Sequence, residues 1–184
     1  EDEYRRFYTS EEYRRCYSYG DYKKSLQKKY SYKEGNHIYD EVSRAIEISN
    51  FTNVLEFGAG GGWNLIPFIK AGAKVLGVDY GQEMVMMGKE KNIPMIQGGI
   101  EKISGKYDVI ILNHVLEHSL NPIKTLKTLT NHLSSESIIY LGVPNILNFS
   151  FAQLQNAHTY SFTIDTLKAI CEHAYLEPIK MGSA

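Results

Sequence analysis

Residues 54–62 join a carboxylate to a run of glycines at the end of an apolar stretch, and the segment reads VLEFGAGGG. Glycine has no Cβ, so a ligand can approach its main chain closely, and the N–H groups of a helix that follows attract an anion. A second acid, Asp79, lies 19 positions after Gly60, where the next apolar run ends. A carboxylate there can bind the two hydroxyls of a ribose. The pattern therefore predicts a nucleoside site.

Two classes of adenosine-containing cofactor use such a site. A dinucleotide needs a third glycine three positions after the second, so that the helix packs close to the strand and faces the pyrophosphate. Trp63 stands at that position. Glu56 would repel a diphosphate, but its charge suits the positive sulfonium and amino group of S-adenosylmethionine. The residues thus favour S-adenosylmethionine and disfavour a nicotinamide-dependent oxidoreductase.

The elements that must position these residues follow from short apolar runs that alternate with helical segments. The runs are nearly continuous, which is typical of strands covered on both faces. They are Val54–Phe57, Lys74–Val78, Pro94–Gln97, Tyr107–Leu112 and Ser137–Val143, and the helical segments are 38–46, 62–71, 82–91, 121–133 and Thr163 or Asp165 to Tyr175. This order predicts an α/β fold with a doubly wound, mostly parallel, Rossmann-like sheet.

Two local expectations refine this fold. Pro67 removes a hydrogen-bond donor early in a helix, which predicts a kink or a late helix start. Leu176–Lys180 is expected to begin a sixth strand just before the chain stops, so the C-terminal strand pair is expected to be truncated.

Residues 1–35 differ from the rest of the chain, because they hold eight of the 14 tyrosines, interleaved with Lys and Arg pairs. We expect a helical cap over residues 1–35 and a cofactor-binding domain over residues 36–184. The cap tyrosines could close over the site as a lid, or they could form an amphipathic coat or a homodimer surface.

Composition excludes several classes of function. The 184 residues carry a formal charge of -1, which supplies no positive field for nucleic acid. No apolar stretch approaches the length that crosses a bilayer. The two cysteines, Cys16 and Cys171, lie far apart without nearby His or Cys partners, which predicts no metal site and suits the reducing cytoplasm.

At these motifs, residues 38–180 resemble the class I S-adenosylmethionine-dependent methyltransferases. The resemblance implies a cofactor site built from Glu56, Gly58, Ala59, Gly60, Asp79, Tyr80, Met84, Gly99, Ile100 and Asn113. Tyr80 and Met84 would lie near the adenine, although Met84 could equally pack in the core. Many relatives carry an acid where Gly99 stands, so Glu101 or water would have to replace that contact. Asn113 would line the methionine end.

The string Asn113-His-Val-Leu-Glu-His118 and residues 157–163 are similar to the small-molecule branch of that family, which includes ubiquinone-type and sugar or surface-polysaccharide methyltransferases. We therefore expect methyl transfer to a small-molecule acceptor, such as a hydroxyl of a sugar or nucleotide sugar, with S-adenosylhomocysteine as product. A catalytically silent module that still binds S-adenosylmethionine is the alternative.

Three histidines are candidate bases for that reaction, since histidine is the commonest proton acceptor near neutral pH. His114 follows the fourth strand directly, close to the expected methyl group. His118 could share a helix face with His114 or could cap the turn by bonding to the backbone. His158 could close over the acceptor or could anchor its own loop.

Overall fold

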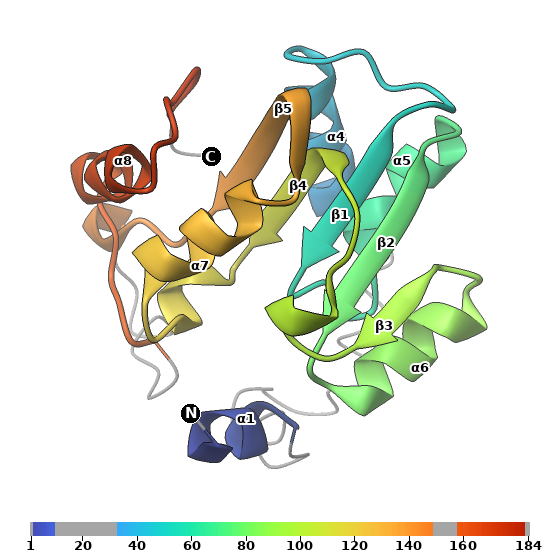
Figure 1. Cartoon of the computed structure of the whole chain (residues 1–184), viewed down its shortest axis with the longest axis horizontal. Helices are drawn as coiled ribbons and strands as arrows, with labels where there is room; N and C mark the ends of the chain where they lie inside the picture. Colours follow the sequence, from blue (N-terminus) through green and yellow to red (C-terminus); the bar gives the residue numbers. More distant parts are fainter. Residues whose placement is uncertain (1, 10–32, 149–157, 183–184) are drawn as a thin grey trace.

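The computed structural model describes residues 2–9, 33–148 and 158–182 (Figure 1). Within this part of the chain, five parallel strands form one sheet in the order β3-β2-β1-β4-β5. The strands are β1 (Asn53–Phe57), β2 (Lys74–Asp79), β3 (Met95–Gln97), β4 (Tyr107–Asn113) and β5 (Leu133–Gly142). The helices are α1 (Asp2–Thr9), α4 (Lys33–Ser43), α5 (Ile66–Lys70), α6 (Gln82–Glu90), α7 (Pro122–Thr130) and α8 (Ile164–His173). Short 3-10 turns are η1 (Trp63–Leu65), η2 (Ile100–Lys102), η3 (Leu116–His118) and η4 (Ile146–Asn148). The predicted doubly wound parallel sheet is confirmed.

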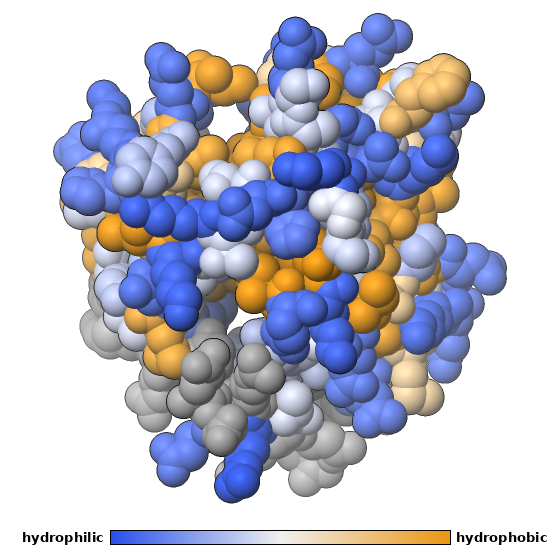
Figure 2. Space-filling model, in the orientation of Figure 1, coloured by the Kyte–Doolittle hydropathy of each residue, from blue (hydrophilic) through white to orange (hydrophobic). Residues whose placement is uncertain are grey.

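The continuous apolar runs reflect burial on both faces of the sheet. Along β4, Val109 and Ile111 belong to one core cluster, whereas Ile110 and Leu112 belong to the other. Helices α4, α5 and α6 contribute apolar residues to the first cluster, and α7 and α8 contribute to the second. Because successive side chains of a strand point to opposite faces, neither face of β4 can be polar. Hydrophilic residues cover most of the rim of the molecule in Figure 2, and apolar residues show toward the middle.

The strand order reverses direction between β1 and β4. The chain runs outward from β1 through β2 to β3, then returns to add β4 on the other side of β1. In an open parallel sheet this reversal opens a crevice outside the carboxyl ends of the strands. Those ends point toward α1 in Figure 1, so the loops after β1, β2 and β4 meet at one edge of the sheet.

Pro67 lies at the start of a helix that begins late, as its position in the sequence predicted. After the glycines the chain first makes the 3-10 turn η1, and the short α-helix α5 begins only at Ile66. The proline lies in the first turn of α5, where backbone N–H groups have no partner within the helix, so its missing N–H costs no hydrogen bond. The late helix start is confirmed.

Two predicted boundaries are wrong at the connection from α7 to β5. The helix ends at Thr130 rather than at residue 133, and β5 begins at Leu133 rather than at Ser137. A bulge separates the pairs Tyr107↔Leu133 and Val109↔Ile138. The Ser134 hydroxyl within it donates to the main-chain carbonyl of Tyr107 at 3.1 Å. The polar residues of this bulge look like a loop in the sequence, but they extend the strand.

The predicted sixth strand is also wrong. Leu176–Lys180 forms no strand in the structure, and Pro178 within it lacks the N–H that a ladder needs. The final helix agrees with expectation: Thr163 is the N-cap of α8, and Thr163 and Thr166 form a reciprocal capping box.

The predicted N-terminal cap lies partly outside the described residues. Tyr13, Tyr17, Tyr19, Tyr22, Tyr30 and Tyr32 are among those not described. Helix α4 begins at Lys33 and packs against η1, where Gly35 lies close to the backbone of Asn64. No helix in the described ranges is long and apolar enough to span a bilayer.

We predict that Thr163→Ala lowers the free energy of unfolding by about 1 kcal/mol, because it removes the hydroxyl that accepts from the Thr166 N–H at 3.2 Å. Thermal or urea unfolding measures the change. Thr163→Ser keeps the cap and is the matched control; an equal loss in both variants would contradict the capping explanation.

Candidate active site at the carboxyl edge of the sheet

The glycine-rich loop turns sharply at three positions. Gly58, Gly60 and Gly62 have φ angles of 73°, 54° and 75°, in the left-handed region that favours glycine. A Cβ on Gly58 would lie 2.5 Å from Cγ2 of Val115 in the loop after β4. The two loops therefore approach too closely for any larger residue.

Several N–H groups of this loop already donate within the protein. Gly58 and Ala59 both donate to the Val78 carbonyl, at 2.8 and 3.0 Å. Gly62 donates to the Ala59 carbonyl at 2.8 Å. The 3-10 turn that follows has three residues, so the long helix N-terminus that would attract an anion is not formed here. The loop offers close approach to main chain rather than a row of helix N–H groups.

Asp79 links the loop to the end of β2. Its Oδ2 accepts from the Gly60 N–H at 2.8 Å, and its Oδ1 accepts from the Gly81 N–H at 2.7 Å. A carboxylate can accept about four hydrogen bonds, so these two donors orient it and are compatible with hydroxyl donors from a ribose. The 19-residue spacing seen in the sequence thus corresponds to a direct contact between acid and glycine.

Glu56 is buried at the end of β1 with 1% of its surface exposed. The side-chain amide of Asn64 donates to its Oε1 at 2.7 Å, whereas its Oε2 is buried and has no hydrogen-bond partner. Burial raises the pKa of Glu56 to about 8; the Asn64 hydrogen bond opposes this rise, and the charges of Asp79 and Glu34 add to it. A positive group beside Glu56 would restore its charged form and gain a strong partner.

The residues expected near the adenine gather beside the ends of β2 and β3. The Tyr80 hydroxyl lies so close to Gly99 that a Cβ there would be 2.3 Å from it. Glu101 accepts from the Gly99 N–H at 3.2 Å, so an acid is present beside Gly99 even though none occupies that position. Ile100 is half-buried in η2. Met84 is 1% exposed in α6.

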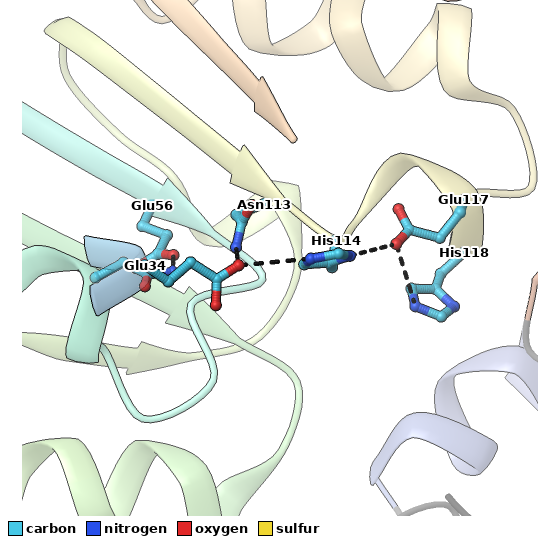
Figure 3. Close-up of polar contacts among 7 residues, drawn as sticks. Glu34, Glu56, Asn113, His114, Glu117 and His118 are labelled. Carbon is cyan, nitrogen blue, oxygen red and sulfur yellow. Dashed lines mark hydrogen bonds and ion pairs between the residues drawn. The ribbon is translucent and has the colours of Figure 1, made fainter. Parts of the chain in front are cut away.

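The end of β4 carries a contact that the sequence did not predict. Glu34, from the first turn of α4, accepts from the Asn113 side-chain amide at 2.6 Å. Figure 3 shows the Glu34 carboxylate between Glu56 and His114. The two residues of the hydrogen bond are 79 positions apart, and no local pattern in the sequence links them.

His114 lies between two carboxylates and has a φ of 55°. Its Nδ1 is 3.2 Å from Glu117 Oε1, and its Nε2 is 3.5 Å from Glu34 Oε1 (Figure 3). These hydrogen bonds, first with Glu117 and then with Glu34, raise the pKa of His114 to about 9 despite its partial burial. In this arrangement the imidazole holds its proton at neutral pH, which does not favour a role as base while both carboxylates contact it.

His118 and His158 form a second group around Glu117, which is 1% exposed. The two imidazole rings meet edge to face with centroids 4.9 Å apart. The N–H groups of Thr159 and Tyr160 both donate to the Glu117 carbonyl, at 2.7 and 3.1 Å, and so hold His158 beside η3. Ligand atoms of Glu117, His118 and His158 lie within 4.8 Å of one another, a set that could hold a metal ion. The sequence predicted no such group, because Glu117 and His158 are 41 positions apart (158 − 117).

The structure therefore brings most of the predicted site residues to one edge of the sheet. Glu56, Asp79 and Asn113 lie at the ends of β1, β2 and β4, and the glycine loop and His114 follow β1 and β4. His118 and His158 lie beyond His114, around Glu117. Sequence reasoning missed Glu34, Asn64 and Glu117. The helical spacing of Glu117 from His114 was the one available signal, since residues three apart on a helical turn can interact.

Comparisons with known proteins agree with this geometry. A family model described as a methyltransferase domain matches residues 22–180. The ubiquinone biosynthesis O-methyltransferase of Saccharomyces cerevisiae mitochondria is 29% identical, over 63% of this chain and 44% of that protein. The chain thus spans less than half the length of this curated relative.

Solved methyltransferase structures share the fold. An S-adenosylmethionine-dependent methyltransferase from Archaeoglobus fulgidus superposes with a TM-score of 0.64 and 20% identity, over 84% of this chain and 74% of that one. The plantazolicin methyltransferase BpumL, in complex with S-adenosylhomocysteine, has a TM-score of 0.64 and 20% identity, over 82% and 68%.

We predict that Glu56→Gln stabilises the protein increasingly as the pH rises. The folded chain keeps a proton on Glu56 up to a pKa of about 8, whereas the unfolded chain releases it near the ordinary value of 4.5, so folding stability is lost between these values. Glutamine keeps the Asn64 hydrogen bond and removes this loss, which should amount to several kcal/mol at pH 9.

Thermal unfolding of both proteins from pH 5 to pH 9 measures the difference. Glu41→Gln is the control, because contact with Lys180 lowers the pKa of Glu41 and its removal should give no such gain. If the difference in stability between Glu56→Gln and the parent protein does not change with pH, the raised pKa of Glu56 would be refuted.

Proposed function

The chain belongs to the methyltransferase domain family, and from this premise we propose that it transfers the methyl group of S-adenosylmethionine to an oxygen atom of a small molecule. The observation that carries the proposal is the contact between the Asp79 carboxylate and the Gly60 N–H, beside the buried Glu56. Together they place a ribose-binding acid, the main chain of a glycine and a buried carboxyl group side by side.

The donor would lie across the ends of β1, β2 and β4. Asp79 would bind the ribose hydroxyls, and Tyr80, Met84, Gly99 and Ile100 would surround the adenine. Glu56 would face the positive end of the methionine part, beside Asn113. Trp63 supports this donor over a dinucleotide, because it stands at the position where a loop that binds a pyrophosphate needs its third glycine.

The reaction needs chiefly alignment, since the sulfonium already activates the methyl group. The acceptor oxygen attacks the methyl carbon on the side opposite sulfur; the new O–C bond forms as the C–S bond breaks, and its electron pair stays on sulfur, which becomes a neutral thioether. The acceptor proton passes to a base or to water. Alignment alone can supply on the order of 7 kcal/mol. His114, His118 and His158 are the candidate bases, because they lie at the outer side of the site; His114 could act only after its contacts with Glu34 and Glu117 break and it releases its proton.

An oxygen acceptor is supported by the relative from yeast, whose name describes an O-methyltransferase. Within oxygen acceptors we favour a hydroxyl of a sugar or nucleotide sugar, on the sequence pattern of residues 157–163. His158 and Thr159 of that pattern pack against η3 at the outer side of the site, a position suited to contact with an acceptor.

The remaining sequence expectations stay predictions. A lid formed by residues 1–35 gains support from Tyr8 of α1, whose ring meets the His118 ring with centroids 5.8 Å apart. A location in the cytoplasm is consistent with the buried free thiol of Cys171. The homodimer also stays a prediction, and a measurement of the molecular mass in solution would test it.

We predict that Asp79→Ala abolishes binding of S-adenosylmethionine and that Asp79→Asn weakens it on the order of a hundred-fold, because hydrogen bonds to a charged acceptor are lost. Isothermal titration calorimetry measures both, and thermal unfolding checks that each variant is folded. Asp165→Asn, at an exposed position of α8, is the matched control. A parent protein that is folded but binds neither S-adenosylmethionine nor S-adenosylhomocysteine would disprove the proposed function.

Turnover distinguishes an enzyme from a silent binding module. We predict that S-adenosylhomocysteine accumulates when the protein is incubated with S-adenosylmethionine and a panel of polyhydroxylated acceptors, because the sulfonium already activates the methyl group and His118 and His158 are candidate proton acceptors at the outer side of the site. Chromatography detects the product. Tight donor binding without S-adenosylhomocysteine across the whole panel would favour the silent module.

A further inference from the structure

We propose that Glu34 is a positioning residue that pairs with the sulfonium of the methyl donor and makes the site prefer S-adenosylmethionine over its demethylated product. This inference rests on the proposed function, because it assumes that the donor binds at the carboxyl edge of the sheet. It concerns a residue outside every motif that the sequence analysis identified.

Packing of α4 places Glu34 over the site. Gly35, the next residue, is buried against η1, and a Cβ there would lie 3.0 Å from the Asn64 Cα and 3.2 Å from the Trp63 carbonyl oxygen. The first turn of α4 therefore contacts the backbone that follows the glycine loop. Farther along the helix, Ile38 and Val42 are buried in the core and fix the orientation of α4 against the sheet. These contacts fix the backbone of the first turn of α4, from which the half-exposed Glu34 side chain reaches the end of β4.

Asn113, the last residue of β4, and His114, which follows it, orient the Glu34 carboxylate. Asn113 donates to Oε1 at 2.6 Å, and His114 Nε2 lies 3.5 Å from the same oxygen. The proposed function places the reacting methyl group beside these two residues, so the atom that carries the methyl group lies beside Glu34. Figure 3 shows that Glu56 lies on the opposite side of Glu34 from His114.

The charges around the site favour a cation. Glu34 lies between the His114 imidazole, which also contacts Glu117, and the carboxyl group of Glu56, to whose raised pKa the charges of Asp79 and Glu34 contribute. S-Adenosylmethionine brings two positive groups, the amino group and the sulfonium. Glu56, buried at the end of β1, suits the amino group, which is present before and after the reaction. Glu34 contacts Asn113 and His114, beside which the methyl group would be transferred, and so it suits the sulfonium.

This assignment has a chemical consequence for product release. Methyl transfer returns an electron pair to sulfur and removes its positive charge. The attraction to Glu34 is then lost, while the contacts with ribose, adenine and amino group remain. The product therefore binds less tightly than the donor, and the difference depends on the charge of residue 34.

Calorimetry with three ligands tests the inference. S-Adenosylmethionine carries a sulfonium, sinefungin carries an ammonium at the equivalent position, and S-adenosylhomocysteine carries a neutral sulfur; the rest of the three ligands is alike. Glu34→Gln keeps an oxygen that can accept from Asn113 and removes only the charge. We expect this variant to weaken the two cationic ligands about ten-fold and S-adenosylhomocysteine by less than about two-fold.

Two further variants separate charge from structure. Glu34→Asp keeps the charge and should retain at least part of the preference for cationic ligands. Glu41→Gln changes a carboxylate on the same helix that pairs with Arg44 and Lys180, and it should leave all three affinities unchanged. Thermal unfolding confirms that each protein is folded.

The outcomes distinguish this inference from the proposed function. Equal weakening of all three ligands by Glu34→Gln, or no weakening, would overturn the role of Glu34 while the proposed function stands. A parent protein that binds none of the three ligands would overturn both. A ten-fold loss confined to the cationic ligands would support both.

Discussion

The hydrogen bond from the Gly60 N–H to the Asp79 carboxylate is the contact on which the site depends. It joins the turn after β1 to the end of β2 and leaves the acid facing the crevice where the strand order reverses. The turn can reach Asp79 only because its glycines adopt positive φ angles, and it can lie beside the loop after β4 only because Gly58 has no side chain. Backbone geometry, rather than a special side chain, thus creates the space in which an adenosine would lie.

Around that frame, the site concentrates negative charge at a cost to stability. Glu56 is buried with one carboxylate oxygen unpaired, which is unfavourable unless a cation arrives or a proton is bound. His114 lies between Glu34 and Glu117 and has a left-handed backbone conformation. A ligand that brings positive charge beside Glu56 would offset the cost of burying its carboxylate, which is the physical reason to prefer a sulfonium donor over a diphosphate.

The comparisons and the geometry contribute different kinds of knowledge. The family model shows the family, and the solved structures show the fold. The choice of acceptor, the base and the role of Glu34 depend on side chains outside the glycine loop, and so they are proposals tied to particular contacts. The cluster of Glu117, His118 and His158 lies at the outer side of the donor site, where those choices are made.

The sequence by itself determined the parallel sheet, the glycine loop and the acid after β2, because these depend on local patterns: unbroken apolar runs, residues without Cβ and a fixed spacing. It also indicated the late start of α5 from Pro67. It misplaced the ends of α7 and β5 and added a strand at Leu176–Lys180, since a bulge and the absence of a pairing partner are properties of neighbouring strands. Only the tertiary structure decided that Glu34 reaches Asn113 and that His114 sits between two acids, because those contacts join α4 to the end of β4 through packing that no stretch of sequence encodes alone.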